Sequence, residues 1–382
     1  MDLPLDGYEL PDTNRILTPA LLVHIDYVDS NVEATLRMLG GDAGRWRPHI
    51  KTAKIPAVLQ RMMTYGIRAF KCSTTLELLT ACESGADDVL VAFAMTGANA
   101  ERTLEIASEF PRTRISVLVE AAEQAQFWSR TGLGVFVDVN PGMDRTGINQ
   151  ERADQVLELA RTINADFRGL HYYDGHMSGV PPAEREAQAH RGYDRLLAIV
   201  QALAAANISV NEVITSGTPA APYGYSYPGF AKASFLHRIS PGTVVYNDTT
   251  SLEQLRGFGY RAAVTVLTTV ISHPMAARVT CDAGHKSVSA DAGVPTCVVM
   301  GRPDLQPLKP SEEHLPLEVT PGAPAPNIGE RLYLVPRHVC PTVNNFDEAL
   351  IVEGGMIRGS ARVRARGHEN PLTLIRDYAA IS

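Results

Sequence analysis

The chain has 382 residues, of which 45% are hydrophobic, and this is enough for a full core in two domains or in one large α/β barrel with an appendage. Its formal net charge of −7 gives no electrostatic reason to expect a nucleic acid or an anionic membrane as partner, because both require a basic surface. The acidic first residues do not resemble a signal peptide, and no stretch has the roughly 18–20 apolar residues of a membrane helix, so we expect a soluble, cytoplasmic protein.

Short β-like runs alternate with helical patterns from about residue 30 to residue 245. The predicted strands are 45–51, 68–72, 88–93, 115–120, 135–140, 167–173, 212–216 and 239–246, and the predicted helices are 55–65, 75–84, 98–109, 121–131, 152–164 and 184–207. Strands joined by crossover helices pair in parallel, and eight in succession is the number in a (β/α)8 TIM-type barrel. A doubly wound open sheet is the alternative, and it is disfavoured because no G-x-G-x-x-G turn follows a predicted strand.

The pattern changes after about residue 255, where helical periodicity is largely lost. The predicted strands there are 262–271, 278–282, 296–300, 315–319, 331–335, 348–352 and 356–363, separated by Gly, Pro and Asp turns. They indicate a mostly antiparallel β-domain, and the early run 20–26 could pair into it. We therefore predict a barrel domain over residues 27–255 and a β-domain made of residues 1–26 and 256–382.

The five cysteines are scattered along the chain without a C-x-x-C pair: Cys72, Cys82, Cys281, Cys297 and Cys340. In a chain of this size they are expected to be reduced rather than to form a disulfide framework. Four of them are expected in the core, where free cysteine is commonly buried. Cys340 differs from the others because His338 lies two residues before it.

Lys51 ends the first predicted barrel strand. Active sites of such barrels lie at the carboxyl ends of the strands. A lysine at that end can lose its charge through desolvation and attack a carbonyl carbon. The alternative for Lys51 is an ordinary solvated surface lysine, and Lys54, which enters the next predicted helix, fits that alternative better.

His338 and Cys340 form a potential metal-binding pair. If their segment is extended, residues i and i+2 point to the same face, so the imidazole and the thiolate can bind one ion. Two protein ligands leave positions open for substrate and water, as in catalytic sites, and a thiolate favours Zn over Mg or Ca. The alternative is a core cysteine beside an incidental histidine.

Other predicted strand ends also carry polar residues. Arg145 lies in the Gly-punctuated turn 140–147, where it could bond an oxyanion or pair with Asp144. The run 171–176 gathers two histidines and two tyrosines at one strand end, which packing alone does not readily explain.

Two glycine turns near the last predicted barrel strands suggest a phosphate site. Ser216-Gly217-Thr218-Pro219 and Pro241-Gly242-Thr243 place glycine beside hydroxyl residues. Backbone N–H groups and hydroxyls can hold a phosphate without basic side chains, and barrels commonly bind phosphates at their last strands. Ordinary turns are the alternative for each.

Together these segments resemble the D-threonine aldolase and D-serine dehydratase family of fold-type III, alanine-racemase-like pyridoxal phosphate (PLP) enzymes. The resemblance extends from Thr18 to Gly367. The run Arg47-Pro48-His49-Ile50-Lys51-Thr52 is similar to the family's Schiff-base lysine motif. Further blocks match in the same order: 142–147, 171–176, 216–219, 240–243, 282–286 and 338–342. No single block is specific, but their conjunction is.

The resemblance implies an eight-stranded barrel with a β-domain, in a homodimer. It implies that Lys51 holds the aldehyde of PLP, that Arg145 approaches the phenolic oxygen of PLP, and that Tyr173 lines its ring. It further implies phosphate contacts and a metal, Zn or Mn, held by these residues: Ser216, Gly217, Thr218, Gly242 and Thr243 for the phosphate, and His338 with Cys340 for the metal. Some aldolase members carry a later histidine as the catalytic base; here His176 is the nearest candidate.

The predicted function is a PLP- and metal-dependent lyase for a small-molecule D-3-hydroxy amino acid. Retro-aldol cleavage to glycine and an aldehyde is placed slightly ahead of dehydration, in which D-serine or D-3-hydroxyaspartate would give a keto acid and ammonia. In both reactions the metal acts as a Lewis acid on the β-hydroxyl. An amino-acid racemase and a non-catalytic PLP-binding protein are further alternatives, and the β-domain with its His-x-Cys pair argues against the second.

Overall fold

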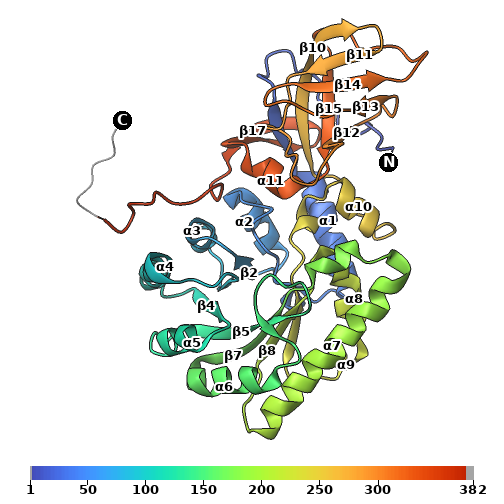
Figure 1. Cartoon of the computed structure of the whole chain (residues 1–382). Helices are drawn as coiled ribbons and strands as arrows, with labels where there is room; N and C mark the ends of the chain where they lie inside the picture. The colour runs from blue at the N-terminus through green and yellow to red at the C-terminus, as the bar shows by residue number, and fades with distance from the viewer. Residues whose placement is uncertain (1, 376–382) are drawn as a thin grey trace. The chain divides into compact units, whose positions relative to one another are not determined.

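The computed structural model describes residues 2–375, which form two compact units (Figure 1). The β-unit contains the residues up to Thr35, Thr52–Val58 and Thr243–Arg366. The barrel unit contains Leu36–Lys51, Leu59–Gly242 and the described residues from Gly367 onward. The domain boundaries expected from the sequence, 27–255 for the barrel and 1–26 with 256–382 for the β-domain, stay a prediction.

Parallel strands form the sheet of the barrel unit. Its order is β2 (Ala69–Cys72), β3 (Asp88–Val91), β4 (Arg114–Val119), β5 (Gly134–Asn140), β7 (Phe167–Tyr172), β8 (Glu212–Thr215) and β9 (Leu236–Ile239), and the short β6 (Ile148–Asn149) pairs with β5. Trp46 pairs with Ile239 in β9, and His49 pairs with Lys71 in β2. The segment 46–50 thus takes the eighth position and closes the sheet into the predicted barrel.

Two predicted barrel strands differ from the structure. The segment 45–51 makes only isolated bridges rather than a regular strand, because Pro48 has no N–H to donate to a neighbouring strand. The last strand was expected at 239–246, but β9 begins at Leu236 and ends at Ile239. Thr243–Val245 instead form the 3-10 helix η5. Gly242 precedes this helix and lies so close to His49 that a Cβ would come within 2.4 Å of the His49 carbonyl oxygen.

Helices surround the barrel strands, as Figure 1 shows for α3 to α7. They are α3 (Thr75–Ser84), α4 (Gly97–Glu109), α5 (Ala122–Trp128), α6 (Ala153–Ile163), α7 (Pro182–Ala205), α8 (Ala221–Ser226) and α9 (Pro228–Ala231), with 3-10 helices η1 (Ala43–Arg45), η2 (Asn164–Asp166), η3 (Gly175–Gly179) and η4 (Thr218–Ala220). Local sequence sets the helix ends. For α3, the Thr74 side chain accepts from the Glu77 N–H, and Gly85 ends the helix at φ +94°.

A buried charge network joins the amino-terminal ends of the barrel strands. Arg47 is fully buried and donates to Glu212 Oε1 (3.0 Å) and to both carboxylate oxygens of Asp88 (3.0 and 2.9 Å). Arg168 and Arg238 also contact these carboxylates. Burial opposes ionisation of Asp88, but Arg47 and Arg168 outweigh it and hold its pKa well below the usual range.

The β-unit is built on a mostly antiparallel sheet. The main order is β13 (Leu305–Pro307), β14 (Leu315–Val319), β11 (Arg278–Cys281), β10 (Val264–Met275), β1 (Ala20–His24), β16 (Glu348–Glu353) and β17 (Met356–Arg362), while β15 (Arg331–Pro336) pairs with β10 and β12 (Cys297–Val299). The pair β1–β16 is parallel and the others are antiparallel. The expectation that the run 20–26 pairs into this sheet is confirmed for Ala20–His24.

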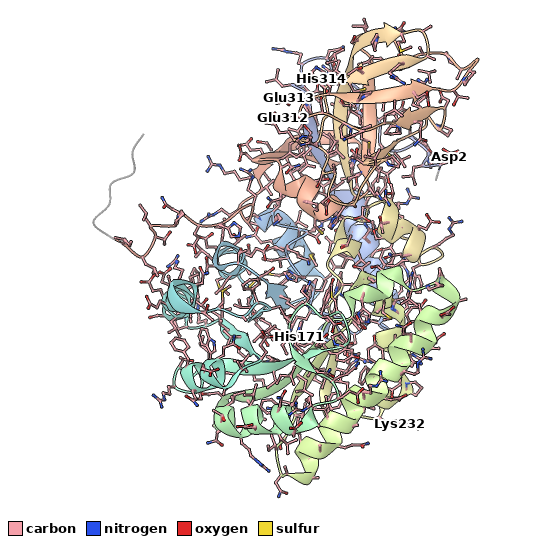
Figure 2. The ribbon with its side chains drawn as sticks, in the orientation of Figure 1. Asp2, His171, Lys232, Glu312, Glu313 and His314 are labelled. Carbon is pink, nitrogen blue, oxygen red and sulfur yellow. The ribbon has the colours of Figure 1, made fainter. Side chains whose placement is uncertain are left out.

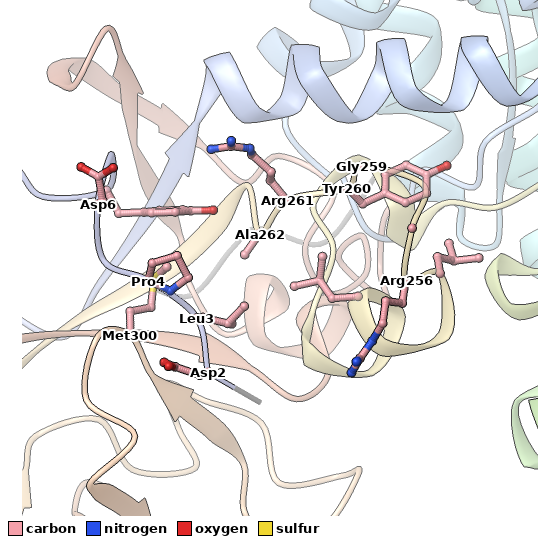
Figure 3. A pocket seen from close by; sticks show the side chains of 14 residues that line it. Asp2, Leu3, Pro4, Asp6, Arg256, Gly259, Tyr260, Arg261, Ala262 and Met300 are labelled. Carbon is pink, nitrogen blue, oxygen red and sulfur yellow. The ribbon is translucent and has the colours of Figure 1, made fainter.

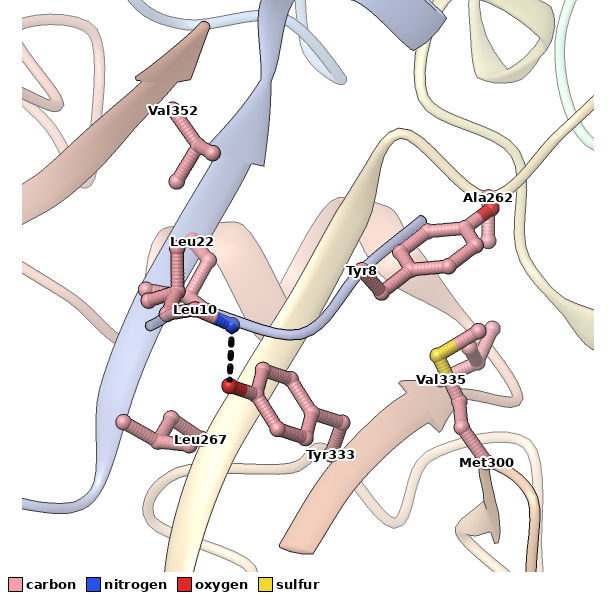
Figure 4. Packing of buried hydrophobic residues seen from close by; sticks show 9 residues of the cluster. All are labelled: Tyr8, Leu10, Leu22, Ala262, Leu267, Met300, Tyr333, Val335 and Val352. Atoms are coloured by element: carbon pink, nitrogen blue, oxygen red, sulfur yellow. Dashed lines mark hydrogen bonds between the residues drawn. The ribbon is translucent and has the colours of Figure 1, made fainter. Parts of the chain in front are cut away.

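The remaining helices are α1 (Ile25–Met38), α2 (Pro56–Thr64), α10 (Thr249–Gln254) and α11 (Val339–Asn344). A core cluster in the β-unit packs the N-terminal segment on the sheet: the Leu10 N–H donates to the Tyr333 hydroxyl at 3.0 Å, and Leu22 and Leu267 lie beside them (Figure 4). None of the helices in residues 2–375 combines the length and the apolar character needed to span a bilayer.

The Arg47 network leads to a stability prediction. Asp88→Asn leaves Arg47 and Arg168 with an incompletely compensated buried charge, so the free energy of unfolding should fall by about 3–5 kcal/mol. Urea unfolding followed by circular dichroism measures the change. Asp154→Asn, which removes the carboxylate of an exposed pair with Arg152, is the control and should unfold like the parental protein. Equal midpoints for the two variants would show that the buried network is not stabilising.

Candidate active site

A cavity of about 400 Å³ opens at the carboxyl ends of the barrel strands. Three predicted site residues line it, namely Lys51, Arg145 and Tyr173. The other lining residues come mainly from the ends of β2 to β7 and from the segments that follow them: His49, Lys71, Ser73, Ala92, Phe93, Ala94, Leu118, Val119, Glu120, Asp138, Thr146 and His171. The prediction that Lys51 lies at the carboxyl-terminal end of the barrel agrees with this geometry.

His49 positions the backbone of Lys51. The Lys51 N–H donates to His49 Nδ1 at 3.2 Å, which leaves the imidazole proton on Nε2. His49 Nε2 lies 3.1 Å from the Ser73 hydroxyl, and that hydroxyl donates to Glu77 at 3.3 Å. This chain of hydrogen bonds ties the segment that carries Lys51 to the start of α3.

Three basic side chains lie close to the ring of Tyr173. Its centroid lies 5.9 Å from Lys51 Nζ, 5.3 Å from Lys71 Nζ and 4.9 Å from Arg145 Cζ. A Cβ at Gly175 or Gly217 would lie 2.5 or 2.9 Å from its carbon atoms, so the two glycines leave room for the ring. A flat aromatic surface thus lies beside two amines and a guanidinium.

The side chains of Asp138, His171 and Lys71 are buried and form a chain of hydrogen bonds. His171 Nδ1 lies 2.7 Å from Asp138 Oδ1, and His171 Nε2 lies 3.2 Å from Lys71 Nζ. Burial and then the charge of Lys71 lower the pKa of His171. Burial opposes ionisation of Asp138, but His171, the Thr146 hydroxyl and Lys71 together outweigh it and lower the pKa of Asp138. An ionised Asp138 beside a neutral His171 places the proton on Nδ1 and leaves Nε2 as an acceptor for Lys71.

The predicted phosphate-binding loop has internal partners in this structure. The Gly217 N–H donates to Asp174 Oδ1 at 3.0 Å. The Ser216 hydroxyl is fully buried and lies 2.9 Å from the Thr215 hydroxyl and 3.1 Å from that of Tyr193. Burial raises the pKa of Asp174 to about 6, and hydrogen bonds from Tyr193 and Gly217 only partly offset it.

The other three residues that were predicted to bind a phosphate belong to different elements. Thr218 begins η4 and is buried, and Gly242 packs on His49 within the barrel unit. Thr243 belongs to the β-unit, where its hydroxyl lies 3.8 Å from the thiol of Cys340.

His176, the predicted base, lies in η3 and is half-buried. Its Nδ1 is buried and has no hydrogen-bond partner among the described residues. Burial lowers its pKa, with Asp144 opposing the shift, so the imidazole is neutral near pH 7. His176 is not among the residues that line the Lys51 cavity, whereas His171 is.

The metal pair lies in the β-unit at the start of α11. His338 precedes the helix in an extended conformation, and Cys340 lies in its first turn. The premise that both residues belong to one extended segment is therefore wrong. Cys340 nevertheless interacts with the imidazole of His338 and raises its pKa.

The surroundings of His338 suit a metal ligand. Asp291 Oδ2 lies 2.6 Å from His338 Nδ1, which leaves Nε2 for an ion, and the Thr52 hydroxyl lies 3.0 Å from Cys340 Sγ. Burial opposes the imidazolium charge, but Cys340 and Asp291 outweigh it and raise the pKa of His338 to about 9, so an ion would have to displace the proton from Nε2. No group of three or more His, Cys, Asp or Glu side chains in residues 2–375 is arranged to hold a metal ion.

Three functional candidates, Lys71, Asp138 and His171, are absent from the predicted site residues, and His171 is noted only as part of the run 171–176. A signal existed for Lys71: a lysine within the otherwise apolar strand Ala-Phe-Lys-Cys is unusual, since buried lysine is rare without a partner. Asp138 likewise interrupts the buried strand β5.

A larger pocket of about 700 Å³ lies in the β-unit (Figure 3). The N-terminal segment from Asp2 to Tyr8 and the loop around Tyr260 line it, together with Met300. It contains none of the predicted site residues, so size alone does not identify the candidate active site.

The fold and the cavity define an alanine-racemase-like protein, a class for which PLP is the implied cofactor. Residues 23–250 match the family model described as "Alanine racemase, N-terminal domain", and residues 263–352 match the "Putative serine dehydratase domain". The chain belongs to the first of these families. The resemblance to D-threonine aldolases and D-serine dehydratases is confirmed by both matches and by the relatives described next.

Relatives and solved structures agree on this placement. The chain is 28% identical to a D-threonine aldolase of Arthrobacter sp., over 92% of this chain and 93% of that protein. It is 25% identical to a D-threo-3-hydroxyaspartate dehydratase of Delftia sp. (strain HT23), over 89% and 95% respectively. The crystal structure of D-threonine aldolase from Filomicrobium marinum superposes with a TM-score of 0.84 at 27% identity and covers 93% of this chain and 97% of that one.

The buried carboxyl of Asp174 predicts a pH dependence. Because its pKa rises from the ordinary value of 3.8 to about 6 on folding, the folded state holds a proton that the unfolded state releases between these values. Its contribution to the free energy of unfolding should fall by up to about 3 kcal/mol as the pH rises through this window. Asp174→Asn should flatten the profile of urea midpoints between pH 4 and 6.5. The exposed Asp87→Asn is the control, and an unchanged slope in Asp174→Asn would contradict the assignment.

Proposed function

We propose that this protein is a PLP- and divalent-metal-dependent lyase that cleaves D-3-hydroxy amino acids to glycine and an aldehyde. The observation that carries the proposal is the cavity in which Lys51 and Arg145 flank the ring of Tyr173. PLP supplies an electron sink that stabilises negative charge at the Cα of a bound amino acid. Lys51 is the residue proposed to hold its aldehyde carbon.

The residues of the cavity fit PLP in charge and shape. Tyr173 offers a flat surface for a pyridine ring, and Arg145 offers a guanidinium for the phenolic oxygen. Ser216, Gly217, Thr218, Gly242 and Thr243 stay our proposed phosphate residues. For Gly217 this assignment requires its N–H to exchange the carboxylate of Asp174 for a phosphate oxygen, and both are anionic acceptors.

The His338–Cys340 pair fits a Zn or Mn ion that polarises the β-hydroxyl of the substrate. Asp291 holds the imidazole so that Nε2 is the metal-binding nitrogen. His176 is the proposed base for the β-hydroxyl proton, because burial lowers its pKa and keeps the imidazole neutral near pH 7. That Lys51 and the metal pair act on one substrate, and that the protein is a homodimer, are further parts of the proposal.

Product analysis tests the function. Purified protein loaded with PLP and Zn or Mn should convert D-threonine to glycine and acetaldehyde, and EDTA should abolish this activity. Lys51→Ala should lose the absorbance band near roughly 410–420 nm of lysine-bound PLP and essentially all turnover. Lys309→Ala, at an exposed lysine, should keep both. A Lys51→Ala variant that turns over D-threonine at the parental rate would refute the proposal.

Dehydration is the second candidate. The match of residues 263–352 to the putative serine dehydratase domain favours it, as does the similarity to the Delftia dehydratase. In that case D-threonine would give 2-oxobutanoate and ammonia, and D-serine would give pyruvate, so the same assay separates the two reactions. Activity that survives EDTA would instead favour a metal-free racemase on the same scaffold.

The proposed metal site predicts an effect of Asp291. Asp291→Asn removes the anionic partner of His338 Nδ1 and should weaken Zn binding by about 10- to 100-fold. Competition with a chromophoric chelator measures the affinity. Asp347→Asn removes an exposed carboxylate of the same unit and should bind Zn like the parental protein. Equal affinities for the two variants would mean that Asp291 does not support the ion.

A further inference from the structure

Lys71 is a second lysine in the Lys51 cavity, and its environment is unlike that of a structural residue. It lies in the middle of β2 and is only 1% exposed, and its backbone pairs with the segment that carries Lys51: the Lys71 N–H donates to the Pro48 carbonyl at 2.9 Å. Figure 2 labels His171, whose Nε2 lies 3.2 Å from Lys71 Nζ. Burying an ammonium is costly unless it is paired, so this lysine requires an explanation.

Two hydrogen-bond acceptors are available to the side-chain ammonium group of Lys71. Its Nζ donates to the Ser240 hydroxyl at 2.6 Å and to His171 Nε2. Both partners are uncharged, and an ammonium has three N–H groups. Among residues 2–375, no acceptor takes the third N–H, and no carboxylate forms an ion pair with Lys71. The ammonium also faces the ring of Tyr173 at 5.3 Å, inside the cavity.

We propose that Lys71 binds an oxyanion of the molecule that occupies the cavity, through the N–H that neither Ser240 nor His171 accepts. The Asp138–His171 pair holds Lys71 in this position. The proposal rests on the proposed function, because it assumes that PLP and an amino acid occupy the cavity. The oxyanion belongs either to the phenolic group of the cofactor or to the carboxylate of the substrate.

The charges around Lys71 make this contact depend on pH. Burial is the largest cause that lowers its pKa, to about 7, followed by the charge of Lys51; Asp138 and Asp174 oppose this shift, and Arg145 adds to it. His171 contributes no charge when neutral. Lys71 is therefore partly protonated at neutral pH. Because an anionic ligand favours the charged form of Lys71, the affinity for that ligand falls as the pH rises through the pKa of Lys71.

The first experiment measures binding rather than turnover. PLP binding is followed by the absorbance of the lysine-bound cofactor, and ligand binding by its change on adding D-alanine or D-alaninol, which has the same skeleton without the carboxylate. Lys71→Met is compared with Lys232→Met, which removes an exposed lysine of the same unit (Figure 2). A carboxylate contact predicts about 10- to 100-fold weaker D-alanine binding in Lys71→Met with unchanged D-alaninol binding. A phenolate contact predicts a similar loss of PLP affinity and an upward shift of the pH midpoint of the absorbance band.

Asp138→Asn is the second variant, and it keeps Lys71 in place. Loss of the carboxylate favours neutral Lys71, so the affinity for D-alanine or PLP should be lost at a lower pH than in the parental protein. If Lys71→Met fails to fold, this pH profile decides. Values for Lys71→Met within twofold of those for Lys232→Met, or an unshifted profile in Asp138→Asn, would overturn the proposal.

Borohydride reduction separates the two proposals. The sequence contains six lysines, Lys51, Lys54, Lys71, Lys232, Lys286 and Lys309, so peptide mass spectrometry can locate the reduced cofactor. Label on Lys51 with an unaffected Lys71→Met variant leaves the proposed function intact and refutes the role of Lys71. Label on Lys71, or no absorbance band in the parental protein, refutes both.

Discussion

The candidate active site depends on the buried guanidinium of Arg47. Pro48 prevents the segment 46–50 from forming a full ladder of backbone hydrogen bonds, yet this segment closes the barrel and ends at Lys51. Arg47 compensates with side-chain bonds to Asp88 on β3 and Glu212 on β8 and with a bond to the Phe70 carbonyl on β2. Contacts with three strands thus fix the segment 46–50, which its backbone hydrogen bonds hold only weakly. They thereby also fix the position of Lys51, which follows this segment.

Charged side chains are paired differently at the two ends of the barrel. At the amino-terminal end, Arg47, Arg168 and Arg238 face two carboxylates in direct contact, so every charge has a partner and the network is structural. At the carboxyl-terminal end, Lys71, Lys51 and Arg145 lie close to the ring of Tyr173. The carboxylate of Asp138 is connected to Lys71 only through the neutral imidazole of His171. Three basic side chains close to an aromatic ring suit an anionic aromatic ligand, and PLP is such a molecule.

In the β-unit, the short helix α11 determines the surroundings of His338 and Cys340. Because α11 begins directly after His338, the imidazole and the Cys340 thiol meet although they belong to different backbone conformations. Asp248 fixes this junction by accepting from the Val339 N–H at 3.0 Å, and Asp291 orients the imidazole. These two side chains, His338 and Cys340, are the ones that we propose as ligands of a metal ion.

The sequence by itself determined the barrel, the β-sheet and the location of Lys51, because alternating apolar runs and helical periodicity are local properties, and the ordered blocks made the family recognisable. Only the tertiary structure decided that Lys71, His171 and Asp138 form one chain: they lie on β2, β7 and β5, and no spacing within the sequence encodes contacts between strands that the barrel brings together. The tertiary structure also decided that the Gly217 N–H donates a hydrogen bond to Asp174 and that Cys340 lies in a helix. Both features depend on long-range packing that overrides local propensity.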